Sequence, residues 1–313
     1  MYSNLSNFSE GVDTAFVVIF SIITFFLVAL TAVLIYFLIR YREKKNPVPT
    51  QIEGNVWLEI IWTVIPIGLV IGMFYYGWMA WIPMLSDAPE DAIEIKTTAQ
   101  MWSWRFEYEN GKKMDTLIVP LGKPVELLVT SPDVLHSLYI PAFRIKQDIV
   151  PGRVTKMWFE ATTEGSYDLF CAEYCGLQHS FMTTEVKVLR QEAYDEWYID
   201  TSAAVKIAST PGALGLQILR DNGCVACHSL DGSKLVGPTY KGIFGHEVEV
   251  VTKGTERTLV VDAEYIKKSI YSPDEDLVKG FSKGLMRSYQ NELSEEEVEQ
   301  IIVFLETLSD KEH

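Results

Sequence analysis

The stretch CAEYCGLQHSFM (residues 171–182) places two thiols, an imidazole and a thioether in the order C-x3-C-x3-H-x2-M. Soft sulfur ligands beside imidazole are typical of a copper site. A blue-copper site with one ion uses one cysteine, two histidines and a weak axial methionine, so this stretch has one cysteine more than such a site needs. Because two bridging thiolates can hold two ions, the stretch predicts a dinuclear copper centre.

The second histidine of this predicted centre comes from upstream, at the start of an expected strand. We predict two bridging thiolates, one imidazole capping each ion, and a thioether and a backbone carbonyl oxygen completing the set: Cys171, Cys175, His136, His179, Met182 and the carbonyl of Glu173. Sharing one electron over two ions limits the change of ligand geometry when an electron is gained or lost, which suits rapid one-electron transfer.

Three other interpretations of the stretch stay open at the level of sequence. The two cysteines could form a disulfide in an oxidising compartment. The set could bind zinc, although methionine is a poor zinc ligand. The i, i+4, i+8 spacing could mark one face of a helix, although Gly176 and the strand-like surroundings oppose a helix there.

The residues around this stretch, 92–189, alternate short β-branched and aromatic runs with turn signals such as Asn110-Gly111 and Pro151-Gly152. Many short strands at this spacing predict a β-sandwich or barrel. The expected strands are Ile93–Thr98, Trp102–Tyr108, Thr116–Val119, Val125–Thr130, Leu135–Ile140, Thr155–Glu160, Tyr167–Cys171 and Thr183–Leu189.

A second redox motif lies in the last hundred or so residues, where Cys224, Cys227 and His228 form the C-x-x-C-H pattern that attaches a c-type haem. The thiols would bond to the haem vinyl groups and His228 would be the proximal iron ligand. Met286 is the one methionine after Met182, so we predict it as the sixth ligand. The alternative is His246, which would give a bis-histidine haem of lower potential.

The C-terminal part is expected to be a small, helical cytochrome domain over residues 210–313. A helix is predicted over Ala213–Asp221, before the haem motif. The last helix begins at a capping box, Ser294 to Glu297, and has an apolar stripe that should pack on the first one. Residues 190–209 are a mixed, polar and partly helical linker, and the break at Thr210-Pro211-Gly212 marks the domain boundary.

Two apolar runs in residues 1–91 are long enough to cross a bilayer, at about 14–40 and 57–84. The alternative of a secretory signal peptide fits the first run less well, because the run is long and no Lys or Arg precedes it. Between the runs lie Arg40, Arg42, Lys44 and Lys45. The positive-inside rule therefore places this loop in the cytoplasm and both chain ends outside, in the compartment that covalent haem attachment requires. We expect a bacterial cytoplasmic membrane.

The chain of 313 residues has a formal net charge of −15, which makes nucleic acid an unsuitable partner. An acidic surface suits docking of a basic protein, and plain solubility is the alternative explanation.

On these motifs the chain resembles subunit II of the haem–copper cytochrome c oxidases, with a fused C-terminal cytochrome c as in the caa3-type enzymes. The copper loop CAEYCGLQHSFM, the segment PAFRIKQDIVPGR (141–153) and LEIIWTVIP (58–66) are similar to that family. The resemblance implies a two-helix transmembrane hairpin, a cupredoxin-like all-β sandwich (92–189) with a dinuclear CuA centre, and an all-α class I cytochrome c domain. In the methionine loop, Arg287 stands where that class often has proline.

The resemblance also implies roles for three further residues. Glu173 would bind Mg²⁺ at the interface with subunit I. Glu59 would lie at the mouth of a proton path shared with that subunit; otherwise it is a carboxylate at a helix N-terminus. Trp102 would pass electrons to copper; otherwise it is a packed aromatic, and its segment MWSWRF lacks the central tyrosine of the family.

The implied activity is that of a respiratory oxidase subunit. It would accept electrons at the c haem from a cytochrome c or a quinol-oxidising complex and pass them through copper to subunit I, which reduces O2 and translocates protons. Subunits I and III and the lipid bilayer are the expected partners. The alternatives are the CuA-containing subunit of a nitric oxide reductase, and a stand-alone membrane-anchored electron carrier or copper-delivery protein.

Overall fold

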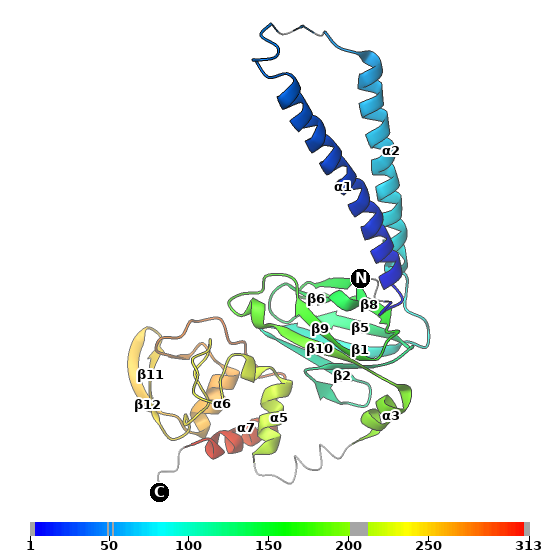
Figure 1. Cartoon of the computed structure of the whole chain (residues 1–313). Coiled ribbons are helices and arrows are strands. Elements are labelled where there is room, and N and C mark those ends of the chain that lie inside the picture. Colours follow the sequence, from blue (N-terminus) through cyan, green and yellow to red (C-terminus); the bar gives the residue numbers. More distant parts are fainter. Residues whose placement is uncertain (1–3, 49, 52, 201–211, 310–313) are drawn as a thin grey trace.

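The computed structural model describes residues 4–48, 50–51, 53–200 and 212–309. These residues form a helical hairpin, a sandwich of two sheets and a smaller C-terminal domain (Figure 1). The hairpin rises from one side of the sandwich, and the C-terminal domain lies on another side, away from the hairpin. The C-terminal domain is taken below as residues 212–309, and the sandwich domain as residues 93–189.

The hairpin consists of α1 (Ser9–Arg40) and α2 (Val56–Trp81), which the 3-10 turn η1 (Ile82–Leu85) continues. Both helices are long and apolar enough to cross a membrane. In each helix, the most apolar segment has no residue buried within the described part of the chain. Such an exposed apolar surface is favourable in the hydrocarbon core of a bilayer, where the helical backbone satisfies its own hydrogen bonds. The predicted spans 14–40 and 57–84 lie inside these helices.

Polar contacts join the start of the hairpin to the sandwich. Arg144 Nε lies 2.7 Å from Asp13 Oδ1, and Ser6 Oγ donates to the carbonyl oxygen of Phe143 at 2.8 Å. Asp13 is buried, and a buried carboxylate requires such a partner. The sandwich is therefore held directly at the end of the first membrane helix.

The sandwich contains two five-stranded sheets, in the orders β3-β2-β1-β5-β8 and β4-β10-β9-β6-β7. Residues along strands such as β2 alternate between buried and half-buried, as expected where one face packs on the core. The strands are β1 (Ile93–Gln100), β2 (Ser103–Tyr108), β3 (Lys113–Met114), β4 (Leu117–Pro120), β5 (Pro124–Thr130), β6 (His136–Ile140), β7 (Ile145–Ile149), β8 (Thr155–Glu160), β9 (Gly165–Cys171) and β10 (Thr183–Leu189).

The predicted all-β sandwich is confirmed, and eight of its strands were expected within a few residues of their observed bounds. The expected strand Trp102–Tyr108 begins one residue later, at Ser103, because Trp102 lies in the turn between β1 and β2. Strands β3 and β7 were not predicted. β7 lies at the edge of its sheet, and the sequence IKQDI is too polar to show the alternation of a strand.

Helix α3 (Gln191–Ile199) follows the sandwich and packs back on it. The ring centroids of Trp197 and Tyr108 are 4.9 Å apart. Helix α3 forms the helical part of the predicted linker 190–209. Residues 201–209 of that linker, and Thr210 and Pro211 of the predicted break, lie outside the described residues.

The C-terminal domain has a second core, built around the crossing of α5 (Ala213–Asp221) and α7 (Glu295–Thr307). The predicted bounds of α5 and the capping box at Ser294 are both confirmed. Gly215 lets the helices approach, since a Cβ there would lie 2.1 Å from the carbonyl oxygen of Gln300. Helix α6 (Ala263–Tyr271), the 3-10 turn η4 (Cys224–Ala226) and a sheet complete the domain: β11 (Glu247–Thr252), β12 (Thr255–Val260) and β13 (Asp276–Val278).

Candidate metal centre and adjoining haem pocket

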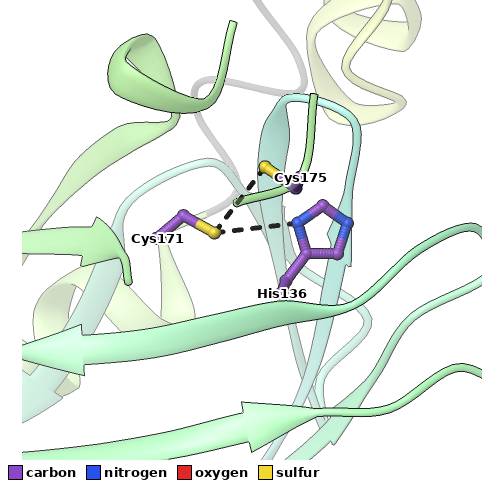
Figure 2. A group of neighbouring side chains, drawn as sticks. All are labelled: His136, Cys171 and Cys175. Carbon is purple, nitrogen blue, oxygen red and sulfur yellow. Dashed lines mark hydrogen bonds between the residues drawn. The ribbon is translucent and has the colours of Figure 1, made fainter. Parts of the chain in front are cut away.

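The predicted copper donors converge at one end of the sandwich. His136 begins β6, Cys171 ends β9, and the loop from β9 to β10 brings back Cys175, His179 and Met182. Strands β6 and β9 are paired, with Leu138 opposite Cys171, so the ladder itself sets His136 near the first thiol. In Figure 2 the sulfur of Cys171 faces both the imidazole of His136 and the sulfur of Cys175, and a dashed line joins it to each.

The two sulfur atoms form the centre of the cluster and each has its own imidazole. Cys171 Sγ lies 3.8 Å from Cys175 Sγ and 3.8 Å from His136 Nδ1. Cys175 Sγ lies 3.5 Å from His179 Nδ1. The sulfurs are much farther apart than the roughly 2.05 Å of a disulfide, and the loop is not a helix, so those two interpretations are wrong for this structure.

The two weaker donors, a thioether and a backbone carbonyl, each lie near a different sulfur. Met182 Sδ lies 3.7 Å from Cys175 Sγ, and the carbonyl oxygen of Glu173 lies 3.2 Å from Cys171 Sγ. Met182 is fully buried and both thiols are buried as well. Each of the other four predicted donors therefore lies within 3.8 Å of one of the two sulfurs, an arrangement that fits a pair of soft metal ions.

Asp133 orients the imidazole of His136. Its Oδ1 lies 2.8 Å from His136 Nε2, and the backbone N–H groups of Met101 and Val134 donate to the same carboxylate at 2.6 Å each. Since a carboxylate accepts hydrogen bonds, Nε2 carries a proton, and Nδ1 is the ring nitrogen that faces Cys171. A carboxylate behind a ligating histidine fixes its tautomer and its ring orientation.

The pKa values of the two thiols are moved in opposite directions. Burial acts to raise the pKa of Cys171, but the hydrogen bonds with His136, with the backbone of Ser137 and Glu173 and with Cys175 together outweigh it and lower that pKa. Burial raises the pKa of Cys175, and the adjacent charge of Cys171 raises it further. One thiolate therefore forms readily, whereas the second needs added positive charge, which two bridged cations would supply.

The C-x-x-C-H motif lines a cavity in the C-terminal domain. Cys224, Cys227 and His228 form a single turn, in which His228 N–H donates to the carbonyl oxygen of Cys224 at 3.0 Å. Burial raises the pKa of the Cys227 thiol to about 11 and that of Cys224 to about 12. Both thiols line the cavity, which fits the covalent role predicted for them.

His228 is oriented as an axial ligand requires. Its Nδ1 lies 2.7 Å from the carbonyl oxygen of Pro238, which can only accept, so Nδ1 carries the proton and Nε2 is left free. Burial lowers the pKa of His228, which keeps the ring neutral. Gly237 allows this packing, because a Cβ at that position would lie 2.5 Å from His228 Cε1.

Met286 lines the same cavity as His228, whereas His246 is not among its lining residues. Arg287, beside Met286, also lines it, and its buried Nε has no hydrogen-bond partner among the described residues. A group that carries carboxylates would satisfy this donor. The apolar lining, the free imidazole nitrogen and the orphan donor together suit a haem.

The cavity and the metal cluster share a wall. Gln100, Met101 and Asp133 of the sandwich domain line the cavity together with the haem motif. Trp102 follows directly in the chain, and its Nε1 donates to the carbonyl oxygen of Cys175 at 3.1 Å. Trp102 is 4% exposed, and Gly176 makes room for it, since a Cβ there would meet the indole at 3.0 Å.

Two of the predicted site residues lie apart from both sites or have other partners. Glu59 is in the first turn of α2, far along the hairpin (Figure 1), after the helix cap Asn55. The Glu173 carboxylate pairs with Lys146 Nζ at 3.2 Å. Among the described residues, the group of side chains close enough to share a metal ion is His136, Cys171 and Cys175, so a magnesium site at Glu173 would need ligands from elsewhere.

Sequence reasoning missed Asp133 and Gln100. Asp133 lies in the turn Ser131-Pro132-Asp133, three residues before the predicted ligand His136, and a carboxylate at that spacing could have signalled a partner. Gln100 had no comparable signal, because its partners come from the other domain.

Fold and site together define a class of protein: a membrane-anchored electron-transfer protein with a cupredoxin-like copper domain and a c-type cytochrome domain. Three family models match the chain: the transmembrane domain (3–76) and the periplasmic domain (112–189) of cytochrome c oxidase subunit II, and cytochrome c (212–309). Cytochrome c oxidase subunit 2 of Alkalihalophilus pseudofirmus is 33% identical, over 93% of this chain and 85% of that protein. The chain belongs to the cytochrome c oxidase subunit II family.

Two further relatives match shorter parts of the chain. Cytochrome c oxidase subunit 2 of Cereibacter sphaeroides is 32% identical, over 59% of this chain and 73% of that protein. A crystal structure of the periplasmic domain of subunit II of cytochrome oxidase from Bradyrhizobium japonicum is 31% identical, with a TM-score of 0.34, over 35% of this chain and 92% of that one.

Proposed function

We propose that this chain is the electron-accepting subunit of a terminal cytochrome c oxidase in a bacterial cytoplasmic membrane, with both redox domains on the outer side. Its haem and copper, when bound, would carry single electrons from an external donor to subunit I, where O2 is reduced with proton translocation. The observation that carries this proposal is the cluster of six copper-type donors beside the cavity of a C-x-x-C-H motif.

The copper ions would be held by the cluster of thiolates and imidazoles described above. Cys171 and Cys175 would bridge, because their sulfurs are neighbours and each faces a different imidazole. A structural zinc site takes four ligands around one ion. Six donors around two central sulfurs, including the soft thioether of Met182, favour two copper ions instead.

The haem would be held by its two thioether bonds and by an axial histidine. Cys224 and Cys227 supply the thiols, and the free Nε2 of His228 supplies the proximal ligand. Met286 is the proposed sixth ligand, because it lines the cavity and His246 does not. A methionine–histidine pair raises the potential of a haem, which suits a donor to copper.

The chain's own residues would exclude water and connect the two sites. Met182 and both copper-loop thiols are buried, and buried donors reorganise little when a charge arrives. Trp102 bonds to the copper loop and follows Met101 of the cavity wall, so we propose it as the connecting side chain. Glu59 as the mouth of a proton path, and Glu173 as a magnesium ligand shared with subunit I, are proposals that rest on the resemblance to the family.

The test is to replace a bridging thiol in the intact complex. We expect Cys175→Ser to lose copper, to keep its c haem, and to abolish donor-driven O2 consumption. The matched control is Ser180→Ala, an exposed residue on the same loop, which should change none of the three. Retention of copper and full O2 consumption by Cys175→Ser would refute the assignment. Assaying the complex with NO as well as O2 separates an oxidase from a nitric oxide reductase.

A further inference from the structure

The contact between the sandwich domain and the C-terminal domain is a specific one. Gln100, at the end of β1, donates from Nε2 to the carbonyl oxygen of Asn222 at 2.7 Å and accepts at Oε1 from Arg287 Nη2 at 2.8 Å. Gln100 is 3% exposed, so both ends of a buried amide are satisfied by the other domain. A buried amide left without these partners would be costly, which makes the contact selective.

Arg105, a second side chain of the sandwich, also binds Asn222. Arg105, on β2, donates from Nη1 to Asn222 Oδ1 at 3.1 Å. Asn222 is the C-cap of α5, and its own Nδ2 donates to the carbonyl oxygen of Ile218 at 2.8 Å, so its side chain is fixed from both sides. Asn222 is thus held by backbone and side chain at once, two residues before the first cysteine of the haem motif.

The backbone of Gly223 also lies close to two side chains of the sandwich. Gly223 has a φ of +72°, and a Cβ there would lie 2.0 Å from Ser103 Oγ and 2.8 Å from Gln100 Nε2. Glycine therefore meets two independent requirements, a left-handed backbone and a space without a side chain. The turn that begins the haem motif is fitted against the turn that joins β1 to β2.

The charges on the two sides are complementary. Lys113 and Arg105 of the sandwich act electrostatically to favour the charged forms of Asp221 and Glu292 in the C-terminal domain, while Asp115 of the sandwich opposes them at Asp221. In a chain with a net charge of −15, two cations that act on two carboxylates of the other domain favour docking.

We infer that Gln100 and Arg105 are positioning residues that dock the C-terminal domain on the sandwich, so that the sandwich closes the haem pocket with Gln100, Met101 and Asp133. The role of this docking, to keep the two redox sites in one fixed arrangement, rests on the proposed function. With both groups bound, one electron would pass from the reduced haem to the oxidised copper centre, so no other reactant would be needed.

The test compares Gln100→Leu/Arg105→Leu with the native chain in the intact complex. Hydrogen exchange over residues 100–106 and 220–224 should become about tenfold faster, because the hydrogen bonds that hold the docked state are lost. After photoreduction of the haem by an excited ruthenium complex, electron transfer to copper should slow by a similar factor. Copper and haem contents should stay unchanged. The matched control Gln191→Leu, on α3, should change neither rate.

Unchanged exchange and unchanged electron transfer in the double variant would overturn the inference. If the double variant fails to load its metals, Arg105→Leu alone, which alters a partly exposed side chain, should show the same changes in smaller measure. A native chain without copper or haem would refute the proposed function instead, and hydrogen exchange would still decide whether these residues dock the domains.

Discussion

Asp133 is the residue that joins the two halves of the site. Its carboxylate holds His136 Nε2, accepts the backbone N–H of Met101, and lines the cavity of the C-terminal domain. Burial acts to raise its pKa, but the hydrogen bond with His136 and those from backbone N–H groups outweigh burial and lower it. The carboxylate therefore stays charged where it orients a proposed copper ligand.

We expect Asp133→Ala to weaken copper binding about 10- to 100-fold, because the imidazole of His136 loses the partner that sets its tautomer. Competition with a copper chelator measures this affinity. Asp115→Ala, which removes a carboxylate outside both sites, should leave the affinity unchanged. An Asp133→Ala chain that binds copper as tightly as the native one would show that the β6 strand alone orients His136.

At the scale of elements, the C-terminal domain depends on the crossing of α5 and α7. The capping box at Ser294 starts α7, and its buried residues face α5. The two helices approach closely at Gly215, because any side chain there would meet the backbone of Gln300. This crossing sits directly before the C-x-x-C-H turn and so sets the position of the haem motif.

Gly215→Ala should destabilise the C-terminal domain by about 1–3 kcal/mol or more, because a methyl group must force apart two packed helices. Thermal unfolding followed by the absorbance of the c haem measures the loss. Leu214→Ala, on the more exposed side of the same helix, should cost less. Equal stability of Gly215→Ala and the native chain would contradict the close approach.

The elements β11, β12, β13 and α6 meet at one buried carboxylate, Asp276. Burial acts to raise its pKa, but hydrogen bonds from Lys268, Thr252 and Arg257 outweigh it and hold the pKa well below its usual range. A carboxyl with a lowered folded pKa stabilises the fold at every pH above its unfolded pKa of about 3.9. That stabilisation is lost as the pH falls through the folded pKa.

Asp276→Asn should therefore lower the stability of the C-terminal domain at pH 7 by about 1–2 kcal/mol, a modest figure because its cationic partners are partly exposed. The difference from the native chain should shrink in acid below about pH 4. Denaturant unfolding at several pH values measures it. Glu275→Gln removes an exposed partner of the same Lys268 and should cost under about 0.5 kcal/mol. A cost that does not vary with pH would contradict the ionic explanation.

The whole molecule is built from two separate cores and an apolar hairpin. One core fills the sandwich and contains both copper-loop cysteines, and the other fills the C-terminal domain. The hairpin is tied to the sandwich by Arg144 and Asp13, so the copper loop is held at a set distance from the membrane helices. Each redox site thus has its own core, and the interface at Gln100 joins them.

Removal of copper should therefore destabilise one core and not the other. A ligand that binds the folded state tightly stabilises it by several kcal/mol, so a chelator should lower the unfolding temperature of the sandwich by about 5 °C or more. Calorimetry of the detergent-solubilised chain resolves the two transitions, and the transition of the C-terminal domain should move less. Restoring copper should reverse the shift. Equal shifts of both transitions would contradict the division into two cores.

The sequence by itself determined the local features: the ligand spacing of residues 171–182, the C-x-x-C-H motif, the apolar spans and the capping box at Ser294. These depend on neighbours a few residues apart, and local patterns record such contacts directly. Only the tertiary structure decided that Asp133 also lines the cavity of the C-terminal domain, and that Gln100 binds Asn222 across a separation of 122 residues. Contacts at such separations depend on how sheets and domains pack, which no single segment encodes.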